Sequence, residues 1–280
     1  MTDVVLEVDG VTAGFGVTTV LHGVDLHVPA GEVAGVFGLN GAGKSVTMKV
    51  LAGLVAARSG TIRFLGRDIT TMSPEDRVFA GMAHVPQGRQ VFAALSVEQN
   101  LRLGAYALRR RDRGRYDPVL AGVFDRFPLL AERRTQLAGT MSGGQQAALA
   151  VARSLMSEPT LILVDEPSAG LSPMAVQELF ATLQEVAKTG VTMVLVEQNV
   201  AFGLQLVDTV NVMQVGRVVH RGPVAGLDQQ ALAGYLGIGR LLGAGVATSV
   251  AARGPVARRR TRRRREGLTT PKASSNGKAH

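Results

Sequence analysis

One stretch of this sequence constrains the fold more than any other: an apolar run, a glycine-rich loop and a second, periodic apolar run follow one another. The first run, VAGVF, occupies residues 33–37, and the loop reads Gly-x-x-x-x-Gly-Lys-Ser over residues 38–45. Glycines let backbone N–H groups converge on one anion without clashes from a Cβ atom. A strand, such a loop and a helix in this order form a P-loop, which cradles nucleotide phosphates. The sequence therefore predicts a P-loop NTPase core.

The side chains of this loop have separate expected roles. We expect Lys44 to neutralise the β- and γ-phosphates, and Ser45 to bind Mg²⁺. The residues expected to contact the nucleotide here are Gly38, Asn40, Gly41, Gly43, Lys44, Ser45 and Val46.

Two acidic residues follow another buried run. The run LILV at 161–164 leads directly into Asp165 and Glu166. A P-loop needs a second Mg²⁺ anchor at the end of another strand, and Asp165 is the candidate. Glu166 is the candidate general base, because hydrolysis needs a carboxylate near the attacking water. Such a pair alone is more often a solvated turn, and the P-loop favours the catalytic interpretation.

A third apolar run, VTMVLV at 191–196, ends on Glu197, Gln198 and Asn199. Ligands of open α/β sheets bind at the carboxyl ends of the strands. We expect Gln198 to lie beside Asp165 and Glu166 and to face the γ-phosphate. An amide offers N–H donors but no exchangeable proton, so Gln198 is predicted to position the phosphate and not to act as an acid or base.

The remaining patterns predict an α/β fold with a mixed or largely parallel sheet. The three continuous apolar runs indicate parallel strands that are covered on both faces. Between the last two runs, Ser172 and Pro173 open an amphipathic helix that ends at Gly190. Further strands, including those of an N-terminal antiparallel β portion, are expected at 4–8, 20–28, 61–65, 210–215 and 217–220.

An inserted helical subdomain is expected at about 88–157. This part of the chain is rich in Ala, Leu and Arg, and helical spacing appears at 97–110, 118–130 and 144–157. The arginine cluster at 109–115 is interpreted mainly as a solvated face, with membrane headgroups or membrane subunits as the alternative contacts.

The excess charge of the chain lies in its last residues. The net charge is +9, and residues 251–280 hold eight arginines and two lysines against one acid, so the rest of the chain is neutral. We therefore expect a nucleotide-binding domain at 1–240 and a basic, disordered tail at 241–280 that is able to reach an anionic membrane surface. Aromatics make up 4% of residues and none lies among the tail arginines, so nucleic-acid binding by stacking is not expected.

Other compositional features exclude some classes of site. The absence of cysteine excludes disulfides and thiolate metal sites. The five histidines show no metal-ligand spacing. No basic segment follows Met1 and no apolar stretch approaches about 18 residues, so neither a signal peptide nor a spanning helix is expected.

The motif MSGGQQ at 141–146 points to a family. It opens a helix about 20 residues before LILVDEP, and in this order the motifs of residues 1–230 resemble the ATP-binding cassette (ABC) family. The resemblance implies that ATP binds with Mg²⁺, that Phe15 stacks on adenine and that Gln87 contacts both nucleotide and metal. It also implies that two cassettes close head to tail. ATP then lies between residues 38–45 of one chain and Ser142, Gly143 and Gly144 of the other.

Three stretches resemble the ATPase subunit of branched-chain amino acid importers: VPQGRQVFAALSVEQNL, DEPSAGLSP and LVEQNV. The first also resembles the urea and short-amide importer branch. The resemblance implies a second cassette on a different chain, two polytopic membrane subunits, an extracytoplasmic solute-binding protein and a place on the cytoplasmic face of the membrane.

Two rival functions and several departures from the family pattern accompany this interpretation. A non-transport ABC ATPase is disfavoured by the single P-loop and by the short interval between Gln87 and Ser142. A regulatory module without turnover is disfavoured by the intact motifs. Gln198 stands where most members have His. The other departures are Met141 in the signature, Ala147 and Ala148 behind it, and Ser172 in place of the usual Asp of the D-loop, residues 168–172.

Overall fold

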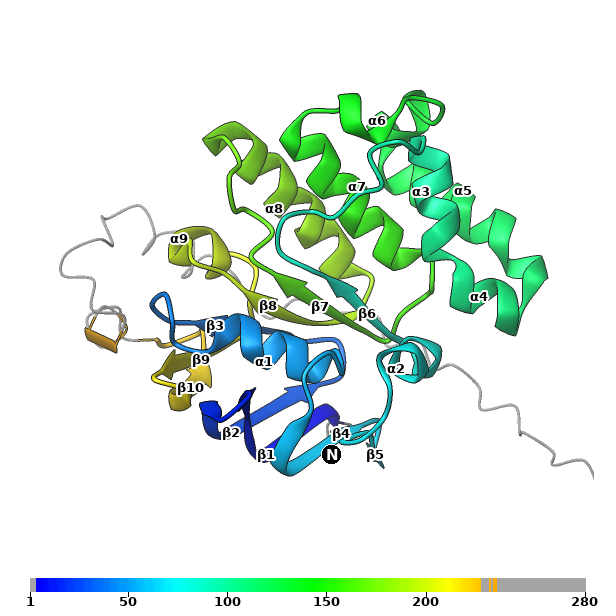
Figure 1. Cartoon of the computed structure of the whole chain (residues 1–280). Helices are drawn as coiled ribbons and strands as arrows, with labels where there is room; N and C mark the ends of the chain where they lie inside the picture. Colours follow the sequence, from blue (N-terminus) through cyan, green and yellow to red (C-terminus); the bar gives the residue numbers. More distant parts are fainter. Residues whose placement is uncertain (1–3, 228–231, 233, 236–280) are drawn as a thin grey trace, which may run out of the picture.

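The computed structural model describes residues 4–227, 232, 234 and 235. Its centre is a six-stranded sheet with the strand order β10-β9-β3-β8-β7-β6 (Figure 1). All neighbouring pairs are parallel except β9 and β10. The strands are β3 (Val33–Phe37), β6 (Met82–Val85), β7 (Leu161–Asp165), β8 (Thr192–Val196), β9 (Thr209–Gln214) and β10 (Arg217–Pro223).

A second, antiparallel sheet is built from the first part of the chain. Its order is β2-β1-β4-β5. The strands are β1 (Val4–Phe15), β2 (Thr18–Pro29), β4 (Ala57–Phe64) and β5 (Arg67–Asp68). The predicted α/β class, mixed sheet and N-terminal antiparallel portion are confirmed, although β1, β2 and β4 are longer than the apolar pattern indicated.

The three central strands are apolar throughout because they pack against two cores. Alternate residues point to opposite faces. Ile162 of β7 lies in the core beneath the helices, and its neighbour Leu163 lies in the core shared with the antiparallel sheet. Met193 and Val194 of β8 divide in the same way. Parallel strands covered on both faces are the expected result.

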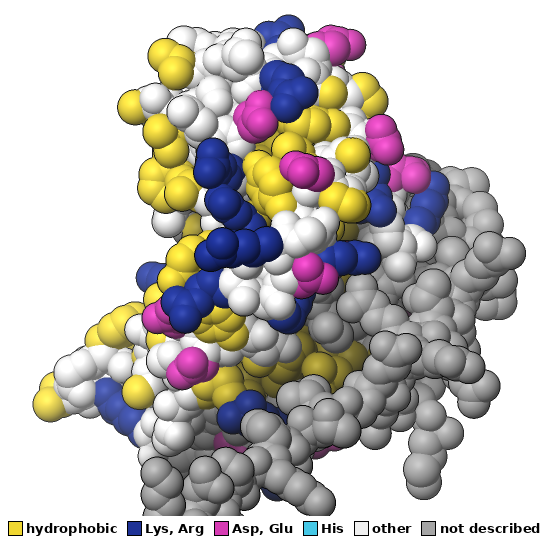
Figure 2. Space-filling model, turned by 90° about the vertical axis from the view of Figure 1, so that its right-hand side faces the viewer, with side chains coloured by type: hydrophobic (Ala, Val, Ile, Leu, Met, Phe, Trp, Pro, Cys, Tyr) yellow, Lys and Arg dark blue, Asp and Glu magenta, His cyan; other side chains and the backbone are white. Residues whose placement is uncertain are grey.

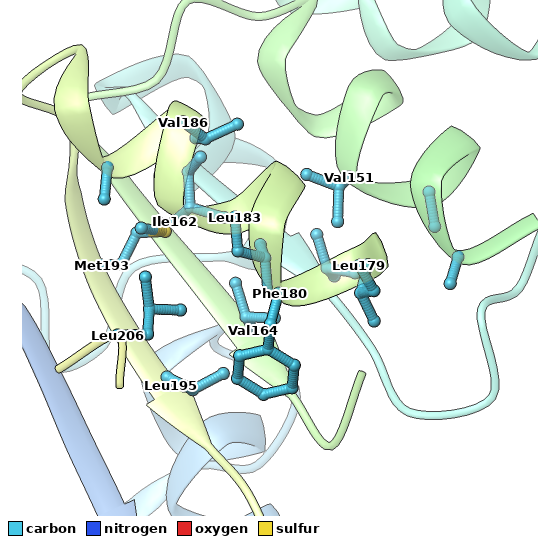
Figure 3. Close-up of a cluster of buried hydrophobic side chains, with 14 of the residues drawn as sticks. Val151, Ile162, Val164, Leu179, Phe180, Leu183, Val186, Met193, Leu195 and Leu206 are labelled. Carbon is cyan, nitrogen blue, oxygen red and sulfur yellow. The ribbon is translucent and has the colours of Figure 1, made fainter. Parts of the chain in front are cut away.

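Two helices cover the two faces of this sheet. Helix α1 (Lys44–Leu51) packs in the core shared by the two sheets. Helix α8 (Pro173–Lys188) lies on the opposite face, and its buried side chains rest on β7 and β8 (Figure 3). They are Val176, Leu179, Phe180, Leu183 and Val186. The predicted cap of α8 is confirmed, since the Ser172 side chain accepts a hydrogen bond from the Ala175 N–H.

Helices fill the interval between β6 and β7, beside α8 (Figure 1). They are α3 (Val97–Gly104), α4 (Tyr106–Arg111), α5 (Tyr116–Arg126), α6 (Pro128–Glu132) and α7 (Gly143–Leu155); short helices α2 (Pro74–Ala80) and α9 (Val200–Gly203) lie elsewhere. The interval agrees with the region expected to be helical. Its treatment as a separate subdomain stays a prediction.

Two of the predicted helices are interrupted. The helix expected at 97–110 breaks at Ala105, which has ψ of 7° and ends α3. The helix expected at 118–130 breaks at Phe127, because the following Pro128 disfavours helical geometry in the residue before it. None of the described helices is long and apolar enough to cross a membrane. The predicted basic tail, 241–280, lies outside the described residues.

Candidate active site

The glycine loop begins at the carboxyl end of β3 and ends at the first turn of α1. A Cβ atom at Gly38 would lie 2.4 Å from the carbonyl oxygen of Met213, so this backbone passes too close for any larger residue. Gly43 precedes α1 with a φ of 102°, which favours glycine. No side chain caps α1, so the N–H groups of its first turn remain available to an anion.

Lys44 holds a buried cation at the base of this loop. Its side chain is 4% exposed, and Nζ donates to the carbonyl oxygens of Gly38 at 2.8 Å and Leu39 at 3.1 Å. Nζ also lies 3.9 Å from Oε1 of Glu166. Burial lowers the pKa of Lys44, while the nearby acids oppose that shift. A phosphate that enters the loop would stabilise this desolvated ammonium electrostatically.

Ser45 and Asp165 bring two oxygen ligands together. Ser45 Oγ lies 3.4 Å from Oδ1 of Asp165, although 120 residues separate them. Burial, and after it the charge of Glu166, raises the pKa of Asp165 to about 6. A hydroxyl and a carboxylate are ligands that suit Mg²⁺, which also binds phosphate oxygens and water.

Glu166 lies at the meeting point of three segments. Its φ of 44° is unusual for a non-glycine residue, and its N–H donates to the carbonyl oxygen of Val196 on the neighbouring strand β8. Oε2 accepts hydrogen bonds from Nε2 of Gln87 at 2.7 Å and Nε2 of Gln198 at 2.8 Å. The structure thus places both amides predicted from the sequence on the predicted base.

Ser142, Gly143 and Gly144, the residues predicted to face a partner's ATP, lie at the start of α7 (the signature segment, residues 141–146). Ser142 caps α7 through a capping box with Gln145, and Gly143 and Gly144 form the first turn of that helix. Among the described residues, no hydrogen bond or ion pair joins these three residues to loop 38–45.

Phe15 stands at the end of β1 with half of its surface, 51%, exposed. The hairpin that carries it is held by Arg58, which donates to Thr19 Oγ1 at 2.8 Å and to the carbonyl oxygen of Gly16 at 2.7 Å. An exposed ring on a fixed hairpin is available for stacking on a flat ligand.

The sequence patterns assigned no role to two residues of this region. Glu197 is 1% exposed, and its carboxylate accepts from the N–H groups of Ser168, Gln198 and Asn199 at 2.9–3.0 Å. The sequence signal that could have identified Glu197 is its position directly after a buried strand. Arg89 donates to the carbonyl oxygen of Gly170 at 3.1 Å, and nothing in its sequence context marked it.

The family model described as ABC transporter matches residues 21–169. The chain belongs to the ABC transporter family. It is similar to BraG of Pseudomonas aeruginosa, a high-affinity branched-chain amino acid transport ATP-binding protein, with 40% identity over 79% of this chain and 94% of the relative. It is also 35% identical to LivF of Archaeoglobus fulgidus, a probable branched-chain amino acid transport ATP-binding protein, over 75% of this chain and 88% of that one.

A solved structure shares the fold. It is the ADP conformation of an ATP-binding cassette of an ABC transporter, with a TM-score of 0.71 and 26% identity over 79% of this chain and 91% of that chain. The predicted family and fold are thereby confirmed. As an ABC ATPase, the chain binds and hydrolyses ATP.

Proposed function

We propose that this chain energises an importer for branched-chain or other hydrophobic amino acids. Two observations support the proposal. The amides of Gln87 and Gln198 and the ammonium of Lys44 converge on Glu166, as a hydrolytic site requires. The chain is also 40% identical to BraG, a high-affinity branched-chain amino acid transport ATP-binding protein, over 94% of that relative.

This geometry supports the following proposed roles. Lys44 and the free N–H groups of α1 would bind the phosphates, and Ser45, Asp165 and the amide oxygen of Gln87 would hold Mg²⁺. When bound, the metal neutralises charge on the phosphates. Glu166 accepts a proton from the attacking water. Gln198 adds a positioning donor beside that carboxylate, and positioning is most of what phosphoryl transfer requires of a protein.

The separation of the phosphate loop and the signature segment, the two proposed half-sites of a nucleotide site, supports a head-to-tail pair of cassettes. In the described part of the chain, no hydrogen bond or ion pair joins Ser142, Gly143 and Gly144 to the phosphate loop, so we propose that they bind the ATP held by a partner cassette. The N–H groups at the start of α7 suit the γ-phosphate of that ATP. The partner is proposed to be a different chain.

The helical region offers a surface for membrane subunits. A groove of about 1080 Å³ lies beside α3 and α4, lined by Leu95, Gln99, Leu103, Tyr106 and the arginines at 102, 109, 110, 111 and 113. Lys and Arg side chains gather on this side of the molecule, next to hydrophobic ones (Figure 2). We propose that two polytopic membrane subunits dock on the helical region and on the segment around Gln87, which would place the chain on the cytoplasmic face of the membrane. An extracytoplasmic solute-binding protein would deliver the solute.

Transport in proteoliposomes tests the proposal. The chain is reconstituted with its sister cassette, membrane subunits and binding protein, and uptake of leucine, isoleucine, valine and urea is measured with ATP inside. We expect uptake of the branched-chain amino acids, and its loss with Lys44→Ala. Uptake of urea alone would contradict the amino acid assignment and support the short-amide branch.

A further inference from the structure

The segment after β6 makes an unusually tight turn just beyond Gln87. Three consecutive residues have positive φ: Gly88 at 83°, Arg89 at 66° and Gln90 at 43°. Arg89 and Gln90 are not glycines, so this backbone is strained and persists only where its surroundings fix it. The turn determines where the Arg89 side chain points.

The Arg89 guanidinium joins two other loops of the site. Nη2 donates to the carbonyl oxygen of Gly170, in the loop between β7 and α8, at 3.1 Å. On its other side it lies against the first residue of α7. A Cβ atom at Gly143 would be only 2.8 Å from Nη1 and 3.1 Å from Cζ. In Figure 1 the segment after β6 rises beside α7 and α8, consistent with these contacts.

The charge of Arg89 is poorly placed for the stability of a single chain. The described residues include no ion pair of Arg89 with a carboxylate. The guanidinium stands at the amino end of α7, where the helix dipole is already positive. The guanidinium and the positive end of the α7 dipole repel each other until an anion binds between them. We propose that this anion is the ATP of a partner cassette.

We propose that Arg89 is a positioning residue that links the two half-sites of this chain. Two residues before it, Gln87 holds Glu166, the base of the site that contains this chain's own phosphate loop. The Arg89 guanidinium packs against Gly143, in the half-site offered to the partner, and donates to the carbonyl oxygen of Gly170. A shift of Gln87 on nucleotide binding is therefore transmitted to the partner's site through a rigid turn. This inference rests on the head-to-tail pairing proposed above.

The test compares the Arg89→Met, Arg89→Lys and Arg63→Met variants of the full chain. Arg63 is an exposed arginine on β4 whose ion pair is with Glu7 of β1, and it serves as the matched control. Three quantities are measured: ATP affinity of the isolated chain, kcat and KM of the assembled transporter, and the thermal midpoint. A fourth measurement is ATP-driven association with the sister cassette in a Glu166→Gln background.

For Arg89→Met we expect the ATP affinity and the thermal midpoint to stay unchanged. We expect kcat to fall about tenfold, and association with the sister cassette to need about tenfold more ATP, because one fixed contact is lost. Arg89→Lys should recover part of the lost kcat and part of the lost association, because lysine keeps a charged donor on a long side chain. Arg63→Met should behave as wild type.

A kcat and an association curve equal to those of Arg63→Met would overturn the inference. The inference would also be overturned if Arg89→Met lowered kcat together with the thermal midpoint and Arg89→Lys restored neither. That result would mean that Arg89 only stabilises the fold. Failure of the proposed function looks different: the wild-type transporter itself would show no ATP hydrolysis that depends on Lys44.

Discussion

Glu166 is surrounded by donors in a way that gives each of its oxygens a different environment. Oε2 accepts two amide hydrogen bonds, from Gln87 and Gln198, while Oε1 faces the ammonium of Lys44 at 3.9 Å. Amides orient a carboxylate without changing their own charge, in contrast to a histidine, which titrates near pH 6.5. The neutral Gln198 therefore orients Glu166 without adding a titrating group beside it.

Replacement of Gln198 separates positioning from acid–base chemistry. Gln198→Ala removes one donor to Glu166 and the proposed donor to the γ-phosphate, so we expect a lower kcat with little change in ATP affinity. The loss should be about 1.5–3 kcal/mol, as for a hydrogen bond to a charged group. Gln198→His should preserve activity and add a titration below neutral pH. Measurement of kcat against pH for the three proteins checks this, and an unchanged kcat in Gln198→Ala would leave the amide with no catalytic role.

Asp165 makes the nucleotide-free fold less stable at neutral pH. Burial and the neighbouring Glu166 raise its pKa from 3.8 to about 6, so the folded chain binds this proton more tightly than the unfolded chain does. The contribution of Asp165 to stability therefore falls as the pH rises from about 4 to 6. Asp165→Asn should raise the free energy of unfolding at pH 7 by roughly 2–3 kcal/mol, and the difference should vanish near pH 4. Urea unfolding of both proteins across this range provides the measurement; a less stable variant at pH 7 would contradict it.

At the scale of elements, the central strands and α8 could be predicted because their patterns are local. The apolar runs of β3, β7 and β8 reflect burial on both faces, and the cap of α8 is two residues long. The boundaries between helices α3 to α6 were harder to predict. The helical spacing of apolar residues continues across Ala105, where α3 ends. The β6 strand was not expected either: it is four residues long, and its pairing with β7 is set by residues some 79 positions away.

Helix α1, which carries the phosphate loop, is anchored by an arginine that no motif contains. Arg77 of α2 is 3% exposed, and its guanidinium donates to the carbonyl oxygens of Val50 and Leu51, at the end of α1, both at 2.7 Å. It also bonds three further carbonyls, those of Ile69, Thr70 and Met72. Burial lowers its pKa. Side-chain capping of a buried helix end satisfies carbonyls that otherwise have no partner.

Loss of this anchor should destabilise the domain. Arg77→Met leaves several buried carbonyls unsatisfied, and we expect the free energy of unfolding to fall by about 3 kcal/mol. The exposed Arg63→Met is the control and should change it by less than about 0.5 kcal/mol. Urea unfolding compares the two; equal values would show that the carbonyls find other partners.

Over the whole molecule, the sequence patterns predicted the phosphate loop and the signature segment but not the contacts that join them. The phosphate loop and the signature are recognisable from consecutive residues. Their links run through Arg89 to Gly143 and Gly170, and through Glu197 to Ser168, and these contacts join segments far apart in the chain. A motif consists of consecutive residues that bind a ligand, so it can be recognised in the sequence. These tertiary contacts form only when distant segments come together in the fold, so the sequence patterns did not predict them.

The basic tail should act on membrane affinity and not on folding. Residues 251–280 contain no motif, so their deletion should leave the thermal midpoint and ATP hydrolysis intact. Binding to anionic vesicles should weaken, by up to about 1 kcal/mol for each basic residue near the surface. Co-sedimentation with vesicles of phosphatidylglycerol or phosphatidylcholine, at low and high salt, measures this. Salt-insensitive binding would contradict an electrostatic tail.

Glu166 is proposed to be the base of this ATP-hydrolysing cassette. The most direct test of this role is the turnover of the assembled transporter with Glu166→Gln, beside the ATP affinity of the same variant. Glutamine keeps the shape but cannot accept the proton, so we predict that kcat falls by about 10²–10⁴ while ATP still binds; Lys44→Ala should instead weaken ATP binding. Hydrolysis by Glu166→Gln at the wild-type rate would contradict the account.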